Sequence, residues 1–193
     1  MCYDCENRDH STFFQGAAAM YTIRKGTAAD LDACESIYET HLDYEATHTN
    51  YTNWAKGLYP TRATAEKALA ADTLYVYEED GCVVGCANLN HVQPKEYANI
   101  PWTIPAEGDQ VLVIHTLVFR PTHIGGGRGK RFVAFAEELG RMQGSKVIRL
   151  DTYEGNEPAK AFYPKLNYSY AGITEFFFEN FIWENLICYE KAL

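Results

Sequence analysis

The sequence lacks several features that would place the protein at a membrane or on nucleic acid. Its 193 residues contain no apolar run of about 18 residues, so we expect no membrane-spanning helix. No charged segment followed by an apolar one opens the chain, so we expect no secretion and a cytoplasmic location. Positive charge is scarce, because 17 Lys and Arg against 26 Asp and Glu give a formal net charge of −9. This balance repels phosphate backbones and anionic lipids, so neither nucleic acid nor a membrane is expected as a partner.

Patterns that would bind a metal are scarce too. Cys2 and Cys5 form one C-x-x-C pair, but no second pair follows at the spacing of a zinc site, so we expect no metal. The hydrophobic fraction of 47% and the aromatic fraction of 14% are typical of a globular protein. Residues 1–19 show no periodicity and are interpreted as an N-terminal tail or extension. Residues 20–193 have the length of one domain.

Hydrophobic spacing predicts the element order β-α-α-β-β-β-α-β-α-β-β. Asp80-Gly81 lies between two strand-like runs, which is a strong hairpin signal. Val111 to Val118 is a nearly continuous apolar run, typical of a strand covered on both faces. We therefore expect a single α/β domain with one mixed sheet and helices on both faces. The expected strands cover residues 21–24, 74–78, 82–89, 111–118, 146–151, 168–178 and 186–191.

A glycine-rich loop follows the strand at 111–118. It reads Ile124-Gly125-Gly126-Gly127-Arg128-Gly129 and leads into an amphipathic helix. Glycine permits positive φ and a close approach of the backbone to a ligand. A helix start also offers unpaired N–H groups and the positive end of its dipole, so the pattern favours a pyrophosphate site. Arg128 and Lys130 would add positive charge there.

Two other phosphate-binding loops do not fit this segment. A Walker A loop needs glycine at Ile124 and Ser or Thr at Arg131. A dinucleotide-binding G-x-G-x-x-G would need glycine at Lys130 or Phe132. A glycine-rich turn without a ligand stays open as the alternative.

The loop and the residues before it resemble motif A of the GCN5-related N-acetyltransferase (GNAT) family. The family pattern is Arg/Gln-x-x-Gly-x-Gly/Ala, and Ile124 departs from it by occupying the usual Arg or Gln position. The resemblance implies a GNAT fold with a mixed, mostly antiparallel sheet of about seven strands. It also implies that main-chain amides of the loop cradle the pyrophosphate of acetyl-CoA. The residues concerned are Ile124, Gly125, Gly126, Gly127, Arg128, Gly129 and Lys130.

Residues 156–168 resemble motif B of the same family, Asn-x-x-Ala-x-x-hydrophobic-Tyr-x-Lys-Leu-Gly-Phe/Tyr. Pro164 is unusual in this pattern and Asn167 replaces its glycine. The resemblance implies that Tyr163 protonates the departing coenzyme A thiolate and that Asn156 contacts the pantetheine arm. The alternatives are packing of Tyr163 on a helical stripe and a plain helix cap for Asn156.

Residues 110–118 resemble the strand that splays from its neighbour in this family. The main-chain groups of Leu117 and Val118 would then hold the thioester carbonyl and the pantetheine amide. Direct transfer to an amine needs a group that takes the amine proton. His115 lies on this strand and its ordinary pKa of about 6.5 suits a base, although a hydrogen-bonded core histidine is the alternative. Glu107, Asp109 and Asp151 are weaker candidates, and a water chain is another.

The acceptor side is expected in the first half of the chain. Tyr44, Trp54 and Tyr59 lie among polar residues and could wall a pocket or cover a cation, or could be ordinary core. The aromatic residues at 176–183 suggest either a contact in a homodimer or the far wall of the acceptor pocket. We expect an acetyl-CoA-dependent N-acetyltransferase that acts on a small-molecule amine in a ternary complex. A non-catalytic acyl-CoA sensor and a protein N-acetyltransferase are the alternatives.

Overall fold

The computed structural model describes residues 20–178 and 182–193. The expected tail, which carries Cys2 and Cys5, and Phe181 lie outside the described residues. The helices are α1 (Leu31–Thr47), α2 (Arg62–Ala70), α3 (Arg128–Gln143) and α4 (Glu157–Phe162). The strands are β1 (Tyr21–Lys25), β2 (Leu74–Glu79), β3 (Cys82–Asn90), β4 (Val111–Phe119), β5 (Val147–Tyr153), β6 (Ser169–Phe178) and β7 (Ile182–Ala192). No helix within the described residues is both long enough and apolar enough to cross a bilayer.

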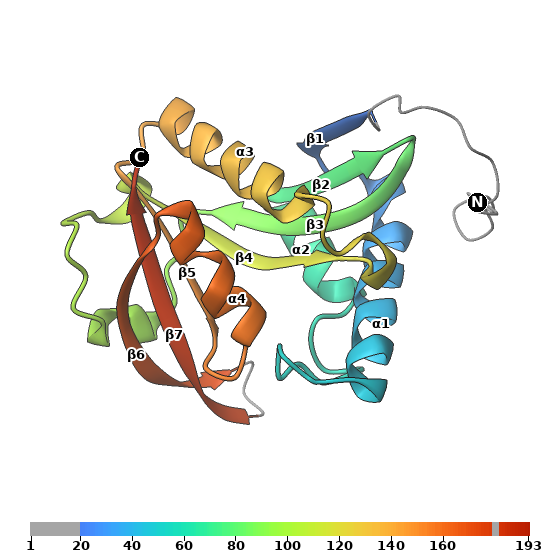
Figure 1. Cartoon of the computed structure of the whole chain (residues 1–193). Helices are drawn as coiled ribbons and strands as arrows, with labels where there is room; N and C mark the ends of the chain where they lie inside the picture. The colour runs from blue at the N-terminus through green and yellow to red at the C-terminus, as the bar shows by residue number, and fades with distance from the viewer. Residues whose placement is uncertain (1–19, 179–181) are drawn as a thin grey trace.

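The strands form one seven-stranded sheet in the order β1-β2-β3-β4-β5-β7-β6 (Figure 1). Only β4 and β5 run parallel among these neighbours, and the other pairs are antiparallel. The predicted element order and the mixed, mostly antiparallel sheet are therefore confirmed. Asp80 (φ 51°) and Gly81 (φ 79°) form the turn between β2 and β3, as a two-residue hairpin requires.

Alternate side chains of β2 face the two helical layers. Tyr75 and Tyr77 pack in the cluster that contains the buried face of α3, whereas Leu74 and Val76 pack in the cluster with α1 and α2. A strand exposes successive side chains on opposite faces, so a run of four apolar residues is explained by a sheet covered on both sides. Phe132 of α3 is fully buried on its side of the sheet, as expected for an amphipathic helix.

The start of α1 is anchored to β1 through one carboxylate. Asp30 accepts hydrogen bonds from Arg24 Nη1 (2.8 Å), from the Thr27 amide (2.8 Å) and from the Thr27 hydroxyl (2.8 Å). Thr27 and Asp30 thus form a capping box. The guanidinium of Arg24 and the bonds from Thr27 outweigh burial and lower the pKa of Asp30 to about 2.

The long connection from β3 to β4 is pinned to the sheet by a buried ion pair. Arg149 of β5 and Glu190 of β7 lie 3.6 Å apart (Nε to Oε2), and each reaches into the connection. Arg149 Nη2 donates to the carbonyl of Ile104 (2.8 Å), and Glu190 accepts from the amide of Thr103 (2.6 Å). The guanidinium also lies 4.2 Å from the ring centre of Trp102. The connection, with its short 3₁₀ turn at Lys95–Asn99, is therefore held firmly beside β5.

Candidate functional site

The parallel strands β4 and β5 separate half-way along their length. They pair from Val111 with Val147 up to Ile114 with Leu150. β4 then continues to Phe119 beside β3, and β5 continues to Tyr153 beside β7. The half-sheet β5-β7-β6 therefore turns away from the half-sheet β1-β2-β3-β4 (Figure 1). Main-chain groups of β4 beyond Ile114 face this opening with no partner strand, so they are available to a ligand.

A β-bulge lies where β4 enters the opening. His115 pairs with Asn88 and Val118 with Cys86, so the two residues between them on β4 face only one on β3. Thr116 has φ 53°, which is rare for a β-branched residue. Its hydroxyl is hydrogen-bonded to the hydroxyl of Tyr59. Strained backbone of this kind is common at functional sites, because the surrounding structure has to hold it.

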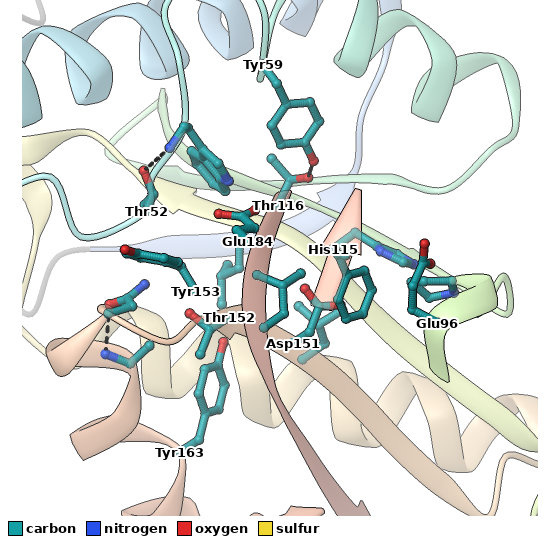
Figure 2. A pocket seen from close by; sticks show the side chains of 18 of the residues that line it. Thr52, Tyr59, Glu96, His115, Thr116, Asp151, Thr152, Tyr153, Tyr163 and Glu184 are labelled. Atoms are coloured by element: carbon teal, nitrogen blue, oxygen red, sulfur yellow. Dashed lines mark hydrogen bonds between the residues drawn. The ribbon is translucent and has the colours of Figure 1, made fainter. Parts of the chain in front are cut away.

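A cavity of about 390 Å³ lies in the opening between the two half-sheets (Figure 2). Both halves of the chain contribute to its wall. The predicted site residues that line it are Trp54, Tyr59, His115, Leu117, Asn156 and Tyr163, together with Asp151, one of the weaker candidates for the base. The side chain of Val118 packs in the cluster with α1 and α2, so only its main chain is available to a ligand.

Tyr163 follows α4 and combines packing with exposure to the cavity. Its ring contacts Phe162, Tyr168 and Tyr189, and the residue is only 8% exposed. Its hydroxyl points into the cavity (Figure 2). Burial, together with the nearby charge of Asp151, raises the pKa of Tyr163 well above that of a free phenol. The hydroxyl therefore stays protonated at neutral pH and can donate to a developing anion.

Asn156 is the N-cap of α4 and also lines the cavity. Its side-chain oxygen accepts from the amide of Ala159 (3.1 Å). Pro158 lies in the first turn, where its missing N–H leaves no gap in the helix. The cap alternative for Asn156 is therefore present in the structure. Contact with a pantetheine arm stays a prediction.

His115 projects from β4 toward the connection before it. Its Nε2 lies 3.1 Å from the carbonyl of Val92 and 3.2 Å from Oδ1 of Asn90. That Oδ1 already accepts from the Val92 amide (2.7 Å), so both atoms near Nε2 are acceptors and Nε2 carries the ring proton. Burial lowers the pKa of His115 to about 4, which keeps the imidazole neutral.

Among the described residues, three carboxylates face the cavity. They are Glu96, Asp151 and Glu184. Asp151 accepts from the hydroxyl of Tyr97 (2.8 Å), and burial raises its pKa to about 6. Glu184 is 7% exposed, and burial together with the charge of Asp151 raises its pKa. Like charges in a shielded cavity favour a cationic guest, because a cation relieves their mutual repulsion.

The connection between α1 and α2 covers the cavity from the opposite half. The buried carboxylate of Glu45 accepts from the amides of Tyr51 (3.0 Å) and Thr52 (3.2 Å) and so fixes this connection. Asn53 then reaches across the opening, where its Nδ2 donates to Glu184 (2.7 Å). Tyr44, by contrast, stacks on the ring of His48 and lies outside the cavity wall. Asn53, Glu96 and Glu184 could not be recognised from the sequence, because isolated polar residues in loops and strands have no distinctive pattern.

The glycine loop has the conformation that its sequence predicts. Gly125, Gly126 and Gly127 have φ of 89°, 58° and 77°, and Gly127 caps the N-terminus of α3. The first turn of α3 leaves its amides without helical partners, so they can bind an anion. Arg128 forms an ion pair with Glu79, which offsets part of its charge. Lys130 is exposed beside it.

Comparison with known proteins identifies the family. A model of the acetyltransferase (GNAT) family matches residues 34–168, which is more than half of the chain. The chain belongs to the GNAT family. The protein is accordingly an N-acetyltransferase, and acetyl-CoA is its co-substrate. The three positive-φ glycines of the loop and the stretch of β4 that has separated from β5 fit such an elongated, phosphorylated co-substrate.

Solved structures agree in fold. This acetyltransferase is similar to a ribosomal-protein-alanine N-acetyltransferase from Brucella melitensis (22% identity, 89% and 99% of the two chains covered, TM-score 0.65). It is also similar to a GNAT-family acetyltransferase from Streptococcus agalactiae (21%, 94% and 98%, TM-score 0.68). A putative acetyltransferase from Salmonella typhimurium, solved with its cofactor acetyl-CoA, matches at 20% identity (90% and 94%, TM-score 0.62). No curated protein gives a significant match.

Proposed function

We propose that this acetyltransferase acetylates the amine of a small, cationic molecule by direct transfer in a ternary complex. One observation carries the proposal. The cavity holds the Tyr163 hydroxyl and the carboxylates of Asp151 and Glu184 within a single enclosure between the split half-sheets. A thioester that lies along β4 and an amine drawn to the carboxylates would meet there.

The cover over the cavity favours a small acceptor over a protein chain. Asn53 and Glu184 bridge the α1–α2 connection to β7, so this side of the opening is crossed by a hydrogen bond. Trp54 and Tyr59 lie edge to face in the same wall, with ring centres 5.6 Å apart. An extended peptide needs an open groove, whereas a compact amine fits beneath such a cover.

Each part of the cavity has a proposed role toward acetyl-CoA. The amides of the glycine loop bind the pyrophosphate, and the main chain at Leu117 and Val118 holds the thioester carbonyl and the pantetheine amide. Asn156 caps α4 and contacts the pantetheine arm. Tyr163 donates its proton to the sulfur as the carbon–sulfur bond breaks. Hydrogen bonds that strengthen as charge develops lower the barrier.

A thiol-release assay tests this proposal. The protein is mixed with acetyl-CoA and a panel of diamines, aromatic amines, amino acids and an alanine-starting peptide. We expect release with one class of cationic small amine. Tyr163→Phe should lower kcat by about 10- to 100-fold and leave acetyl-CoA affinity, measured by calorimetry, unchanged. Tyr168→Phe is the matched control, because it removes a neighbouring phenol that does not line the cavity, and it should stay within about twofold of wild type.

Other outcomes would count against specific parts of the proposal. Full turnover by Tyr163→Phe would remove the acid role. Release with the peptide alone would establish a protein acceptor. Tight binding of acetyl-CoA with no release from any amine would establish the sensor alternative.

A further inference from the structure

We infer that Asp151, rather than His115, takes the proton from the acceptor amine and is the catalytic base of this acetyltransferase. The inference rests on the proposed function, since it concerns the same cavity and the same amine. Asp151 is the first residue of β5 beyond the last β4–β5 pair, Ile114 with Leu150. It therefore lies where the opening begins, on the strand that faces the bulge of β4, and its side chain lines the cavity.

Within residues 20–178 and 182–193, a hydrogen bond holds one oxygen of Asp151 and the other has no such bond. Oδ2 accepts from the hydroxyl of Tyr97 at 2.8 Å. Tyr97 is only 2% exposed and packs among Trp102 and Phe176, so the donor is rigid. A carboxylate fixed through one oxygen presents the other in a defined direction, which is the geometry that proton transfer needs.

Charged and titratable groups surround Asp151 on several elements. Those that face it are Glu96 and Tyr97 of the 3₁₀ turn, His115 of β4, Tyr163 after α4, and Glu184 and Cys188 of β7. Arg149 on its own strand is paired with Glu190. The neighbours are thus mostly neutral or acidic. Burial, with a smaller contribution from the charge of Glu96, raises the pKa of Asp151 to about 6 against the hydrogen bond from Tyr97, so the carboxylate is ionised at neutral pH yet basic enough to accept a proton.

His115 is less suited to the same step. Its Nε2 is occupied as a donor to Val92, and burial keeps the ring at a pKa of about 4. A base of that strength holds a proton poorly at neutral pH. Its contacts with Asn90 and Val92 instead fix the start of the β3–β4 connection.

Two residues, Asp151 and Tyr163, account for every proton that moves in the reaction. The amine enters as a cation and gives one proton to Asp151. Its nitrogen then attacks the thioester carbonyl, and the carbon–nitrogen bond forms. As the carbon–sulfur bond breaks, the sulfur leaves with the proton of Tyr163. The second amine proton restores Tyr163, and Asp151 releases its proton to solvent.

The test is the pH dependence of kcat/KM for the best amine at saturating acetyl-CoA, from pH 5 to 9. Wild type should lose activity below about pH 6, as the base becomes protonated. Asp151→Asn should lower kcat/KM by about a hundredfold and abolish this acid limb. Tyr97→Phe removes a hydrogen bond that lowers the pKa of Asp151, so its acid limb should move to higher pH. His115→Gln is the comparison variant and should keep the limb at its wild-type position.

The outcomes separate this inference from the proposed function. If Asp151→Asn keeps the acid limb, or if Tyr97→Phe leaves it in place while His115→Gln abolishes it, Asp151 is not the base. Calorimetry with acetyl-CoA shows whether each variant is still folded. If wild type binds acetyl-CoA and acetylates no amine, the proposed function fails and this inference fails with it.

Discussion

The ionised carboxylate of Asp151 should lower the free energy of unfolding of the protein, because it is charged and buried in the cavity. The pKa of its carboxyl is about 6 in the folded chain against an ordinary 3.8. One unit corresponds to about 1.4 kcal/mol, so holding the charge in the cavity at pH 8 costs about 3 kcal/mol of folding free energy. Asp151→Asn removes the charge while its amide oxygen can still accept from Tyr97. The variant should therefore gain up to about 3 kcal/mol at pH 8 as it loses activity.

The gain in stability of Asp151→Asn should become smaller at acidic pH. Between pH 3.8 and 6 the folded wild type binds more protons at Asp151 than the unfolded chain, so its stability rises as the pH falls through this window. At pH 5 the advantage of Asp151→Asn should be about half of its value at pH 8. Urea denaturation at both pH values measures the difference, and Asp109→Asn, an exposed carboxylate just before β4, should change stability by less than about 0.5 kcal/mol. A variant that is no more stable than wild type at pH 8, or an advantage that persists unchanged at pH 5, would refute the reasoning.

Two further perturbations follow from the fold and the loop. Asp30→Asn should lower the free energy of unfolding by about 2 kcal/mol at pH 7, because Arg24 lowers the pKa of Asp30 to about 2 in the folded protein. In urea titrations, the difference in stability between wild type and variant should vanish as the pH falls from 3.8 through 2. Gly127→Ala and Gly144→Ala place a methyl group at φ 77° and 81° at the two ends of α3, with open space around each. Thermal melts should show that both variants lose about 1 kcal/mol of stability. Calorimetry should show weaker acetyl-CoA binding for Gly127→Ala alone, and equal effects of the two variants on affinity would contradict the role of the loop.

Regular elements were predictable because their signals are local. Asp80-Gly81 marks its hairpin by turn chemistry alone, and the amphipathic pattern after the glycine loop marks α3, so both appear where the sequence indicates. The glycine loop was also predictable, since only glycine readily adopts three consecutive positive φ angles.

The acceptor side of the site could be predicted only in part. Trp54 and Tyr59 line the cavity as expected, but the other contacts join residues far apart in sequence. Asn53 meets Glu184 across the opening, and Tyr97 meets Asp151 from a separate connection. Thr116 gives no sign of its positive φ, because the bulge is imposed by the pairing of β4 with β3 and not by a glycine. Tyr44 is a typical binding residue by type but stacks on His48 outside the cavity. Its role in acceptor binding stays a prediction.

The split sheet should also make the stability of the protein depend on the concentration of acetyl-CoA. In the part of the chain that the structure describes, only the four residue pairs from Val111/Val147 to Ile114/Leu150 join the two half-sheets by strand pairing. A thioester bound in the opening would contact both half-sheets where their strand pairing has ended. At a hundredfold excess over its Kd, such a ligand adds about 2.7 kcal/mol to the free energy of unfolding. The folded lifetime of the protein, and its resistance to proteases, would then rise and fall with the supply of acetyl-CoA.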